Sequence, residues 1–292
     1  MMPPDFRCYL CGSGSASIRK GHARDDEMLV PLECNQCGLV RLSSFDHITN
    51  SFYSDSHMHD CQPCDPELEL RQNAEDTQRR FSQFKDILAG KNLLDIGCGA
   101  GGFLLKARSI SASVVGVEPE RRLFTIFNEK KLDVYLSIEA VPTVFKPDII
   151  TMFHVLEHIP DPLAMLIKIR NRFFSGANRG GRRVIIEVPN ASDALLTLYS
   201  SDEFSRFTYW SCHLYLFTEN NLETLGGKAG FKAVKVMQYQ RYPLANHLYW
   251  LAKGKPGGHI VWDFLNRENL MSAYADALSS HKACDTIIGI FS

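Results

Sequence analysis

The feature that most constrains the fold of this 292-residue chain is the alternation of short apolar runs with helix-like stretches between residues 93 and 188. The apolar runs have the length of strands, and the stretches between them have the length of helices. Such alternation is typical of βαβ units, so we expect an α/β fold with a mostly parallel sheet and helices on both faces. The expected strands are 93–96, 114–117, 134–136, 148–153 and 184–188, and the expected helices are 103–109, 120–130 and 162–174.

The segments around this core differ in character. Residues 1–45 are rich in cysteine and glycine, and residues 46–70 are polar and irregular, which suggests a linker or a lid. From residue 71 to 292 we expect one larger domain with a helical insertion at about 243–282. A helix is expected before the first strand, because four apolar side chains share one face and Gly90 is a good stop signal. These four are Phe81, Phe84, Ile87 and Leu88. Later elements are expected at 219–229 (helix), 234–239 (strand) and 286–291 (strand).

Nine cysteines stand out in the composition, and six of them form three C-x-x-C pairs within the first 64 residues. The first pair is Cys8 and Cys11, the second is Cys34 and Cys37, and a glycine follows each pair. Two thiolates from each of two tight turns complete a tetrahedral site, so we expect a structural Zn²⁺ ion there. A pair of redox or incidental dithiols is the alternative.

A third pair, Cys61 and Cys64, lies near His57 and His59. A second metal site and a polar loop with reduced thiols both fit this segment, and we favour the loop. Residues 1–45 carry five Lys/Arg and five Asp/Glu, so this segment is not basic. Phosphate contact with nucleic acid is therefore not expected of it.

A glycine loop follows the first expected strand, in the segment LLDIGCGAGGFLLKA at 93–107. Gly97, Gly99 and Gly102 give the pattern G-x-G-x-x-G, and Glu118 follows Gly97 by 21 residues. Dinucleotides and S-adenosylmethionine (SAM) both need close backbone approach at a strand end and an acid for the ribose hydroxyls. The loop by itself therefore leaves both ligands open.

Three further features favour SAM. Asp95 lies two residues before the first glycine, where a carboxylate suits the ammonium of a methionine moiety and would repel a pyrophosphate. The segment PDIITMFHVLEHIPDP places His154, Glu157 and His158 just past the fourth expected strand. The two late strands suit an antiparallel hairpin.

With these motifs, residues 71–292 resemble a class I SAM-dependent methyltransferase. The resemblance rests on DIGCGAGG, on GVEPE at the end of the second strand, and on FHVLEHIPDP, which is similar to small-molecule O-methyltransferases. It implies a Rossmann-like, seven-stranded, mostly parallel sheet with an antiparallel last strand. The four cysteines imply a small zinc-ribbon-like module ahead of it, as in bacterial sugar-modifying methyltransferases.

The resemblance also implies which residues bind SAM. Asp95, Gly97 and Gly99 would hold the amino-acid part, and Glu118 would bind the ribose hydroxyls. Adenine contacts are implied near Ser137 and Ile138, although the acidic residue often found there in the family is absent. The other residues of the implied SAM site are Cys98, Gly101, Pro119, Phe153 and His154, the last of which borders the methyl donor.

Methyl transfer to a hydroxyl requires a group that accepts the hydroxyl proton, and histidine suits that role near neutral pH. The candidates are His154, His158, His213 and His247. We favour His213 as the base, because the pattern W-x-x-H-L-x-x-F-[ST]-x-x-x-L around it resembles an acceptor-facing segment of these methyltransferases. Cys212 stands where relatives that methylate sugar carbon have an acidic residue, so a Glu/His pair is in doubt.

Structural roles compete with these assignments. His213 could cap the helix at 219–229 or pack under it, and Glu157 and His158 could organise the turn before the helix at 162–174. Tyr53 and His57 are candidates for a lid. Aromatic residues near the insertion suit stacking on a sugar ring or ordinary core packing. They are Tyr239, Tyr242, Tyr249, Trp250 and Trp262.

The global composition excludes several classes. The formal net charge is −1, so nothing points to nucleic acid or to an anionic membrane. The N-terminus lacks the pattern of a secretory signal, and no apolar run approaches the length of a membrane span. We therefore expect a cytoplasmic protein, with a homo-oligomer left open.

The sequence predicts transfer of a methyl group from SAM to a small polar acceptor, with a hydroxyl of a sugar or nucleotide-linked sugar favoured. One alternative is an NAD-dependent oxidoreductase that uses the same glycine loop. Another is a non-catalytic zinc-ribbon protein fused to a degenerate methyltransferase. An RNA or protein methyltransferase is disfavoured by the neutral charge and by FHVLEH, which stands where an NPPY-type motif would be.

Overall fold

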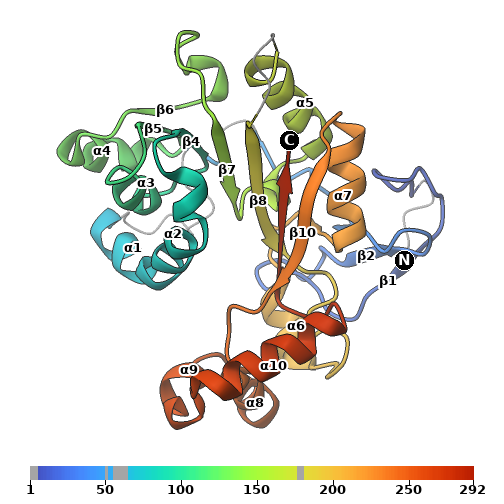
Figure 1. Cartoon of the computed structure of the whole chain (residues 1–292). Helices are drawn as coiled ribbons and strands as arrows, with labels where there is room; N and C mark the ends of the chain where they lie inside the picture. The colour runs from blue at the N-terminus through green and yellow to red at the C-terminus, as the bar shows by residue number, and fades with distance from the viewer. Residues whose placement is uncertain (1–5, 50–51, 55–64, 176–180) are drawn as a thin grey trace. The chain divides into compact units, whose positions relative to one another are not determined.

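The computed structural model of the chain describes residues 6–49, 52–54, 65–175 and 181–292 (Figure 1). The chain divides into two compact units. One, here called the cysteine unit, comprises residues 1–47, 157–163 and 187–289. The other, here called the glycine-loop unit, comprises residues 48–156, 164–186 and 290–292. The N-terminal segment thus belongs to the same unit as most of the C-terminal third of the chain.

The glycine-loop unit contains the predicted alternation of strands and helices. Strand β4 (Asn92–Ile96) pairs in parallel with β5 (Ser113–Val117) on one side and with β7 (Ile149–Phe153) on the other. Strand β6 (Val134–Tyr135) pairs in parallel with β5. The helices are α1 (Pro66–Gln72), α2 (Ala74–Leu88), α3 (Gly102–Ala107), α4 (Phe124–Lys130) and most of α5 (Pro162–Phe173), with short 3₁₀ turns at Arg121–Leu123 and Ile138–Ala140.

The core of the glycine-loop unit explains why these residues form a parallel sheet. Leu93 and Leu94 point to opposite faces of β4, and both are fully buried. A strand covered on both faces reads as a continuous apolar run, as β4 and β7 do. Phe84 and Leu88 are buried on α2, which confirms the predicted apolar face of that helix, and α2 packs beside α3.

All seven strands of the large sheet follow the order β10-β11-β8-β7-β4-β5-β6. Strand β8 spans Arg183–Pro189, β10 spans Ala233–Tyr239, and β11 spans Thr286–Phe291 and runs antiparallel (Figure 1). This confirms the predicted fold class. The chain order reverses at β4, and ligands of open α/β sheets bind beyond the carboxyl ends of the strands at such a point.

The cysteine unit has a second, four-stranded antiparallel sheet that the sequence did not predict. Its order is β1 (Ala16–Ile18), β2 (Pro31–Cys34), β3 (Val40–Leu42) and β9 (Tyr215–Leu216). Strand β9 pairs with β3 through Val40 opposite Leu216. These strands have two to four residues each, which is too short for an alternating pattern to be recognised.

The remaining helices of the cysteine unit lie between its later strands. They are α6 (Asp202–Thr208), α7 (Glu219–Lys228), α8 (Leu244–Lys253), α9 (Gly258–Val261) and α10 (Glu268–Ser280), with a 3₁₀ turn at Asp263–Leu265. Helices α8 to α10 come between β10 and β11 in the sequence and lie side by side beyond the end of these strands (Figure 1). Gly254 ends α8 in the left-handed conformation at φ 63°. None of the helices in the described part of the chain is long and apolar enough to cross a membrane.

Candidate functional site

The glycine loop begins where β4 ends, and its geometry requires glycine. Gly97 has φ +70°, and a Cβ there would lie 2.3 Å from Cγ2 of Val155. Gly99 has φ +50°, and a Cβ there would lie 2.7 Å from Oε1 of Glu69. A side chain at either position would have to displace a neighbour in addition to adopting a disfavoured backbone conformation. Glycine at these two positions therefore lets Val155 and Glu69 approach the loop backbone closely at the carboxyl end of β4.

Glu118 lies at the end of β5 and closes one side of the loop. Its side chain is buried, Oε2 accepts a hydrogen bond from Gly99 N–H at 2.9 Å, and Oε1 accepts one from Glu120 N–H at 3.0 Å. Burial raises the pKa of Glu118 to about 7, even though both N–H groups favour the carboxylate. Each carboxylate oxygen has a second lone pair, so Glu118 can accept further hydrogen bonds from hydroxyls.

Asp95 lies one residue before the end of β4, and it is also buried. Its Oδ1 accepts a hydrogen bond from Oγ1 of Thr151, on the neighbouring strand β7, at 2.6 Å. Burial raises the pKa of Asp95 to about 7, while the Thr151 hydroxyl and the charge of Arg80 act in the opposite direction. Two carboxyl groups at adjacent strand ends thus have pKa values near neutrality.

Three residues near this loop were missed by sequence reasoning. Arg80, on α2, holds its guanidinium carbon 4.8 Å from the ring centroid of Phe153. Glu69, on α1, accepts a hydrogen bond from Ala100 N–H at 2.9 Å through Oε1. Thr151 is hidden within an apolar strand. Helix α1 has seven residues and lies partly in the stretch expected to be a linker, so no helical period identified it.

The other residues of the predicted SAM site lie in the glycine-loop unit at the ends of its strands. Cys98 is buried, and Gly101 at φ +82° precedes α3. Phe153 ends β7, where its ring lies 5.0 Å from Phe103. His154 follows with φ 55°, a left-handed conformation that is uncommon for residues other than glycine. Pro119 follows Glu118, and Ser137 and the buried Ile138 follow β6.

The four predicted metal ligands come together in the cysteine unit. The Sγ atoms of Cys8 and Cys37 are 3.5 Å apart, those of Cys11 and Cys34 are 3.5 Å apart, and all four lie within 4.8 Å of one another. Ligand sulfurs around a tetrahedral Zn²⁺ ion, with Zn–S of about 2.3 Å, lie about 3.8 Å apart. The arrangement fits such an ion, and all four cysteines are free thiols.

Neighbouring backbone and side chains hold the two cysteine turns. Each turn closes through a glycine N–H: Gly12 donates to the Cys8 carbonyl and Gly38 to the Cys34 carbonyl, both at 2.9 Å. Asn221, on α7, donates from Nδ2 to the Cys37 carbonyl at 2.7 Å. The third pair, Cys61 and Cys64, and the nearby His57 and His59, lie outside the described residues.

Two of the predicted catalytic histidines meet in the cysteine unit. The ring centroids of His158 and His213 are 4.9 Å apart, and Glu157 lies beside them. One ligand atom from each of these three side chains lies within 4.8 Å of the other two. The predicted alternative that His213 caps the helix at 219–229 is wrong, because Thr218 caps α7. His154 belongs to the glycine-loop unit.

His247, the fourth histidine, is buried on α8. Its Nδ1 lies 2.7 Å from the hydroxyl of Tyr274, and burial lowers its pKa to about 4, so the imidazole is neutral at physiological pH. The predicted aromatic residues divide between two roles. Trp250 packs in the core against Phe204, with ring centroids 5.2 Å apart, and Tyr249 packs in the same way against Trp262.

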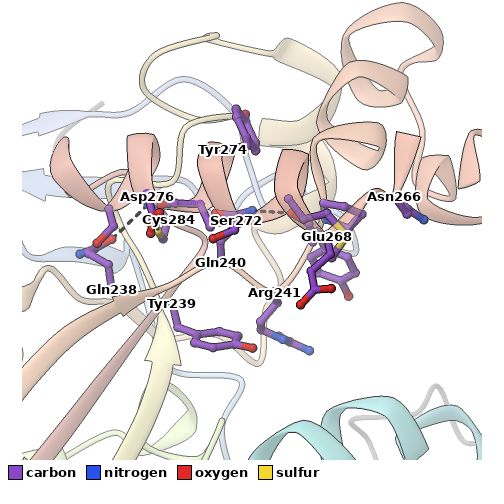
Figure 2. A pocket seen from close by; sticks show the side chains of 15 residues that line it. Gln238, Tyr239, Gln240, Arg241, Asn266, Glu268, Ser272, Tyr274, Asp276 and Cys284 are labelled. Carbon is purple, nitrogen blue, oxygen red and sulfur yellow. Dashed lines mark hydrogen bonds between the residues drawn. The ribbon is translucent and has the colours of Figure 1, made fainter. Parts of the chain in front are cut away.

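Tyr239 and Tyr242 instead line a cavity of about 510 Å³ in the cysteine unit (Figure 2). Figure 2 shows Tyr239 and Arg241, from the end of β10, on one side of this cavity, with Tyr274 of α10 on the other. The lining combines phenols, carboxamides, carboxylates and one guanidinium, which together can bind hydroxyls and pack against a ring. Tyr53, the predicted lid residue, packs against Phe52 with ring centroids 5.0 Å apart.

A seven-stranded sheet with an antiparallel last strand and a glycine loop at the end of β4 defines the class of α/β methyltransferases. A family model described as a methyltransferase domain matches residues 68–236, which is more than half of the chain. The chain therefore belongs to the methyltransferase domain family.

Curated relatives are named ubiquinone biosynthesis O-methyltransferase. The chain is 27% identical over 192 residues to the protein from Photobacterium profundum, covering 60% of this chain and 77% of that protein. It is 27% identical over 124 residues to the protein from Aliivibrio fischeri strain MJ11, covering 37% and 53%. It is 33% identical over 138 residues to the protein from Thiobacillus denitrificans, covering 41% and 58%. In two of these three matches the chain spans little more than half of the relative.

Two solved structures illustrate the extent of structural similarity, and only the first reaches a TM-score that supports a shared fold. A chain in the complex between the Haloferax volcanii Trm112 methyltransferase activator and a methyltransferase has a TM-score of 0.50 and 12% identity, covering 75% of this chain and 92% of that one. A SAM-dependent methyltransferase from Archaeoglobus fulgidus has a TM-score of 0.47 and 18% identity, covering 78% and 94%.

Proposed function

We propose that this protein transfers the methyl group of SAM to a hydroxyl of a small polar acceptor, with a sugar or nucleotide-linked sugar favoured. The observation that carries the choice of SAM is the pair of buried carboxyls, Asp95 and Glu118, beside the glycine loop. A pyrophosphate would be repelled by Asp95, whereas an ammonium would be attracted to it. Family membership agrees with this choice over an NAD-dependent oxidoreductase.

Each part of SAM has a proposed partner in the glycine-loop unit. The ammonium binds Asp95, the backbone of Gly97 and Gly99 faces the amino-acid part, and the ribose hydroxyls donate to Glu118. Arg80 supplies a positive charge for the carboxylate of SAM. The adenine and the rest of the ligand contact residues at the neighbouring strand ends, namely Cys98, Gly101, Pro119, Ser137, Ile138, Phe153 and His154.

The proposed reaction is an in-line displacement. The acceptor oxygen forms a bond to the methyl carbon, the C–S bond breaks, and its electron pair stays on sulfur to give S-adenosylhomocysteine. The acceptor proton leaves with the help of the imidazole pair His213 and His158, with His213 favoured. The name of the curated relatives, ubiquinone biosynthesis O-methyltransferase, supports oxygen as the acceptor atom.

The cavity in the cysteine unit, whose lining includes several polar side chains, supports a sugar-like acceptor. Its volume of about 510 Å³ is within the range of small-molecule sites, and the phenol rings of Tyr239 and Tyr242 can pack against a sugar ring. Arg241 adds a guanidinium that can bind a phosphate of a nucleotide-linked sugar. We propose this cavity as a binding site for the acceptor.

We further propose that Cys8, Cys11, Cys34 and Cys37 bind a structural Zn²⁺ ion. Four thiolates leave no open coordination position for water or substrate, so the ion would stabilise the fold of the cysteine unit without taking part in the reaction. Metal analysis by mass spectrometry should find at least one zinc ion per purified chain. A content clearly below one would contradict this assignment.

Calorimetric titration tests the choice of cofactor. We expect SAM and S-adenosylhomocysteine to bind and NAD to give no heat of binding, and the opposite result would overturn the proposal. Transfer of a labelled methyl group from SAM to a panel of free sugars, nucleotide-linked sugars and phenols then tests the acceptor. Methylation of phenols alone would keep the reaction and replace the acceptor class. Loss of turnover in His213→Ala with SAM binding retained would support the catalytic role, whereas unchanged turnover would exclude it.

A further inference from the structure

We infer that Glu157, His158 and His213 form a second metal site, separate from the four cysteines, which binds one divalent transition-metal ion. One carboxylate oxygen and one nitrogen from each imidazole lie within 4.8 Å of one another. The two imidazole rings make an edge-to-face contact, tilted at 73° with their centroids 4.9 Å apart, which keeps both side chains beside Glu157. Ligand atoms about 2.1 Å from one ion lie at most about 4.2 Å apart, so binding would draw this set slightly closer together.

The backbone holds the two contributing segments together. Leu214 N–H donates to the Glu157 carbonyl at 2.8 Å, which joins the residue after His213 to the residue before His158. Tyr215 Oη donates to the Pro160 carbonyl at 3.1 Å, one turn further along. Both segments belong to the cysteine unit. The ligands are therefore brought together by backbone contacts that do not require the metal, as in a preorganised site.

The donor atoms specify the class of metal. Two imidazole nitrogens and one carboxylate oxygen suit Zn²⁺, Mn²⁺, Fe²⁺ or Co²⁺, and they suit Mg²⁺ or Ca²⁺ less well. Glu157 is fully buried, and a bound dication would balance the charge of its carboxylate. Three protein ligands leave coordination positions open for an exogenous oxygen, whereas the four cysteines leave none.

This inference rests on the proposed function and refines the role of its histidines. A cation at this site lowers the pKa of a hydroxyl that binds at an open position, so the acceptor loses its proton to solvent water near neutral pH. The oxygen then forms its bond to the methyl carbon as the C–S bond breaks. The ion is neither oxidised nor reduced. In this role His158 and His213 are metal ligands. The alternative, in which His213 itself accepts the acceptor proton, would need no metal.

Titration with Mn²⁺ of the whole chain carrying a single Zn²⁺ ion, held by the four cysteines, followed by electron paramagnetic resonance, tests the site. Thiolates bind Mn²⁺ poorly, so Mn²⁺ reports on the nitrogen and oxygen ligands. We expect one Mn²⁺ per chain in the wild type and in the control His281→Gln, which changes an exposed histidine of the same unit. His158→Gln and His213→Gln should each weaken binding at least about ten-fold. Co²⁺, monitored by its visible absorption, provides a second probe.

Three results separate the possible outcomes. If neither Mn²⁺ nor Co²⁺ binds beyond the cysteine site, or if the two histidine variants bind the ion as tightly as the wild type, the inference is wrong. Thermal unfolding of each variant shows whether the fold is retained, and Cys34→Ser should keep the Mn²⁺ site. Binding of S-adenosylhomocysteine is measured in parallel: if it binds but no metal does, only this inference fails, and if it does not bind, the proposed function fails.

Discussion

SAM affinity should depend steeply on pH, because in the proposed site two buried carboxyls must be ionised to bind it. Burial raises the pKa of both Asp95 and Glu118 to about 7. Their ordinary values lie near 4, so at pH 6 the folded protein keeps protons that ordinary carboxyls have lost. The ammonium and the ribose hydroxyls of SAM both require the carboxylate forms. The affinity should therefore rise with pH between 6 and 8 and level off above pH 8.

The magnitude follows from the two pKa values. A carboxyl with a pKa of about 7 is ionised to about 9% at pH 6 and to about 91% at pH 8, which is a factor of about ten. The two groups lie on different strands, and neither raises the pKa of the other, so the factors multiply. The Kd for SAM should be about a hundred-fold higher at pH 6 than at pH 8, or about 2.7 kcal/mol.

Calorimetry at pH 6, 7 and 8, in buffers of different ionisation enthalpy, measures both the affinity and the protons released. About one proton should leave per SAM bound at pH 7, because each carboxyl is then about half protonated. Asp95→Asn and Glu118→Gln should each bind SAM more weakly and should each reduce the pH dependence to about ten-fold. A Kd in the wild type that changes less than about three-fold between pH 6 and 8, with no proton release, would refute the reasoning.

Three further predictions concern stability, and each has its own measurement. Gly97→Ala should lower the free energy of unfolding in urea by about 3 kcal/mol, and the control Gly90→Ala by about 1 kcal/mol. Both glycines have positive φ, but only at Gly97 would a Cβ meet a neighbour, Val155. Equal losses in the two variants would exclude this contact. Asn190→Ala should lower the free energy of unfolding by about 3 kcal/mol. In a buried site, Nδ2 of Asn190 donates to the Cys284 carbonyl at 2.7 Å and to the Gln238 carboxamide oxygen at 3.0 Å. The control Asn220→Ala changes an exposed asparagine and should lower it by less than about 0.5 kcal/mol. Cys34→Ser should lower the midpoint temperature of thermal unfolding. A chelator should lower this midpoint in the wild type but not in the variant. An equal effect of the chelator on both proteins would contradict a structural zinc ion bound by the four cysteines.

The sequence predicted the large sheet well because most of its strands can be recognised from their own residues. A strand buried on both faces is mostly apolar, so β4, β5, β7 and β8 can be recognised without their partners. The strands of the antiparallel sheet have only two to four residues, which is too few to show such an apolar run. For that reason the antiparallel sheet of the cysteine unit was missed, including β9, whose partner β3 lies more than 170 residues earlier in the chain.

The candidate site shows the same division. Asp95, Glu118 and the glycines could be named from spacing alone, because the strand–loop–helix unit that holds them is contiguous. Glu69 and Thr151 could not, because a lone glutamate in a polar stretch and a threonine within an apolar strand have no distinguishing pattern. Arg80 was missed for a similar reason, as one of many charged residues on a predicted helix.

By itself the sequence determined the class of fold, the glycine loop and the four cysteines of the proposed zinc site, all of which were identified from short-range spacing. Only the tertiary structure decided that burial raises the pKa of Asp95 and Glu118 to about 7, because burial depends on every element packed around them. It also decided that His158 and His213 lie beside Glu157, across 55 residues of chain. Long-range contacts of this kind come from backbone hydrogen bonds between distant segments, which no local pattern records.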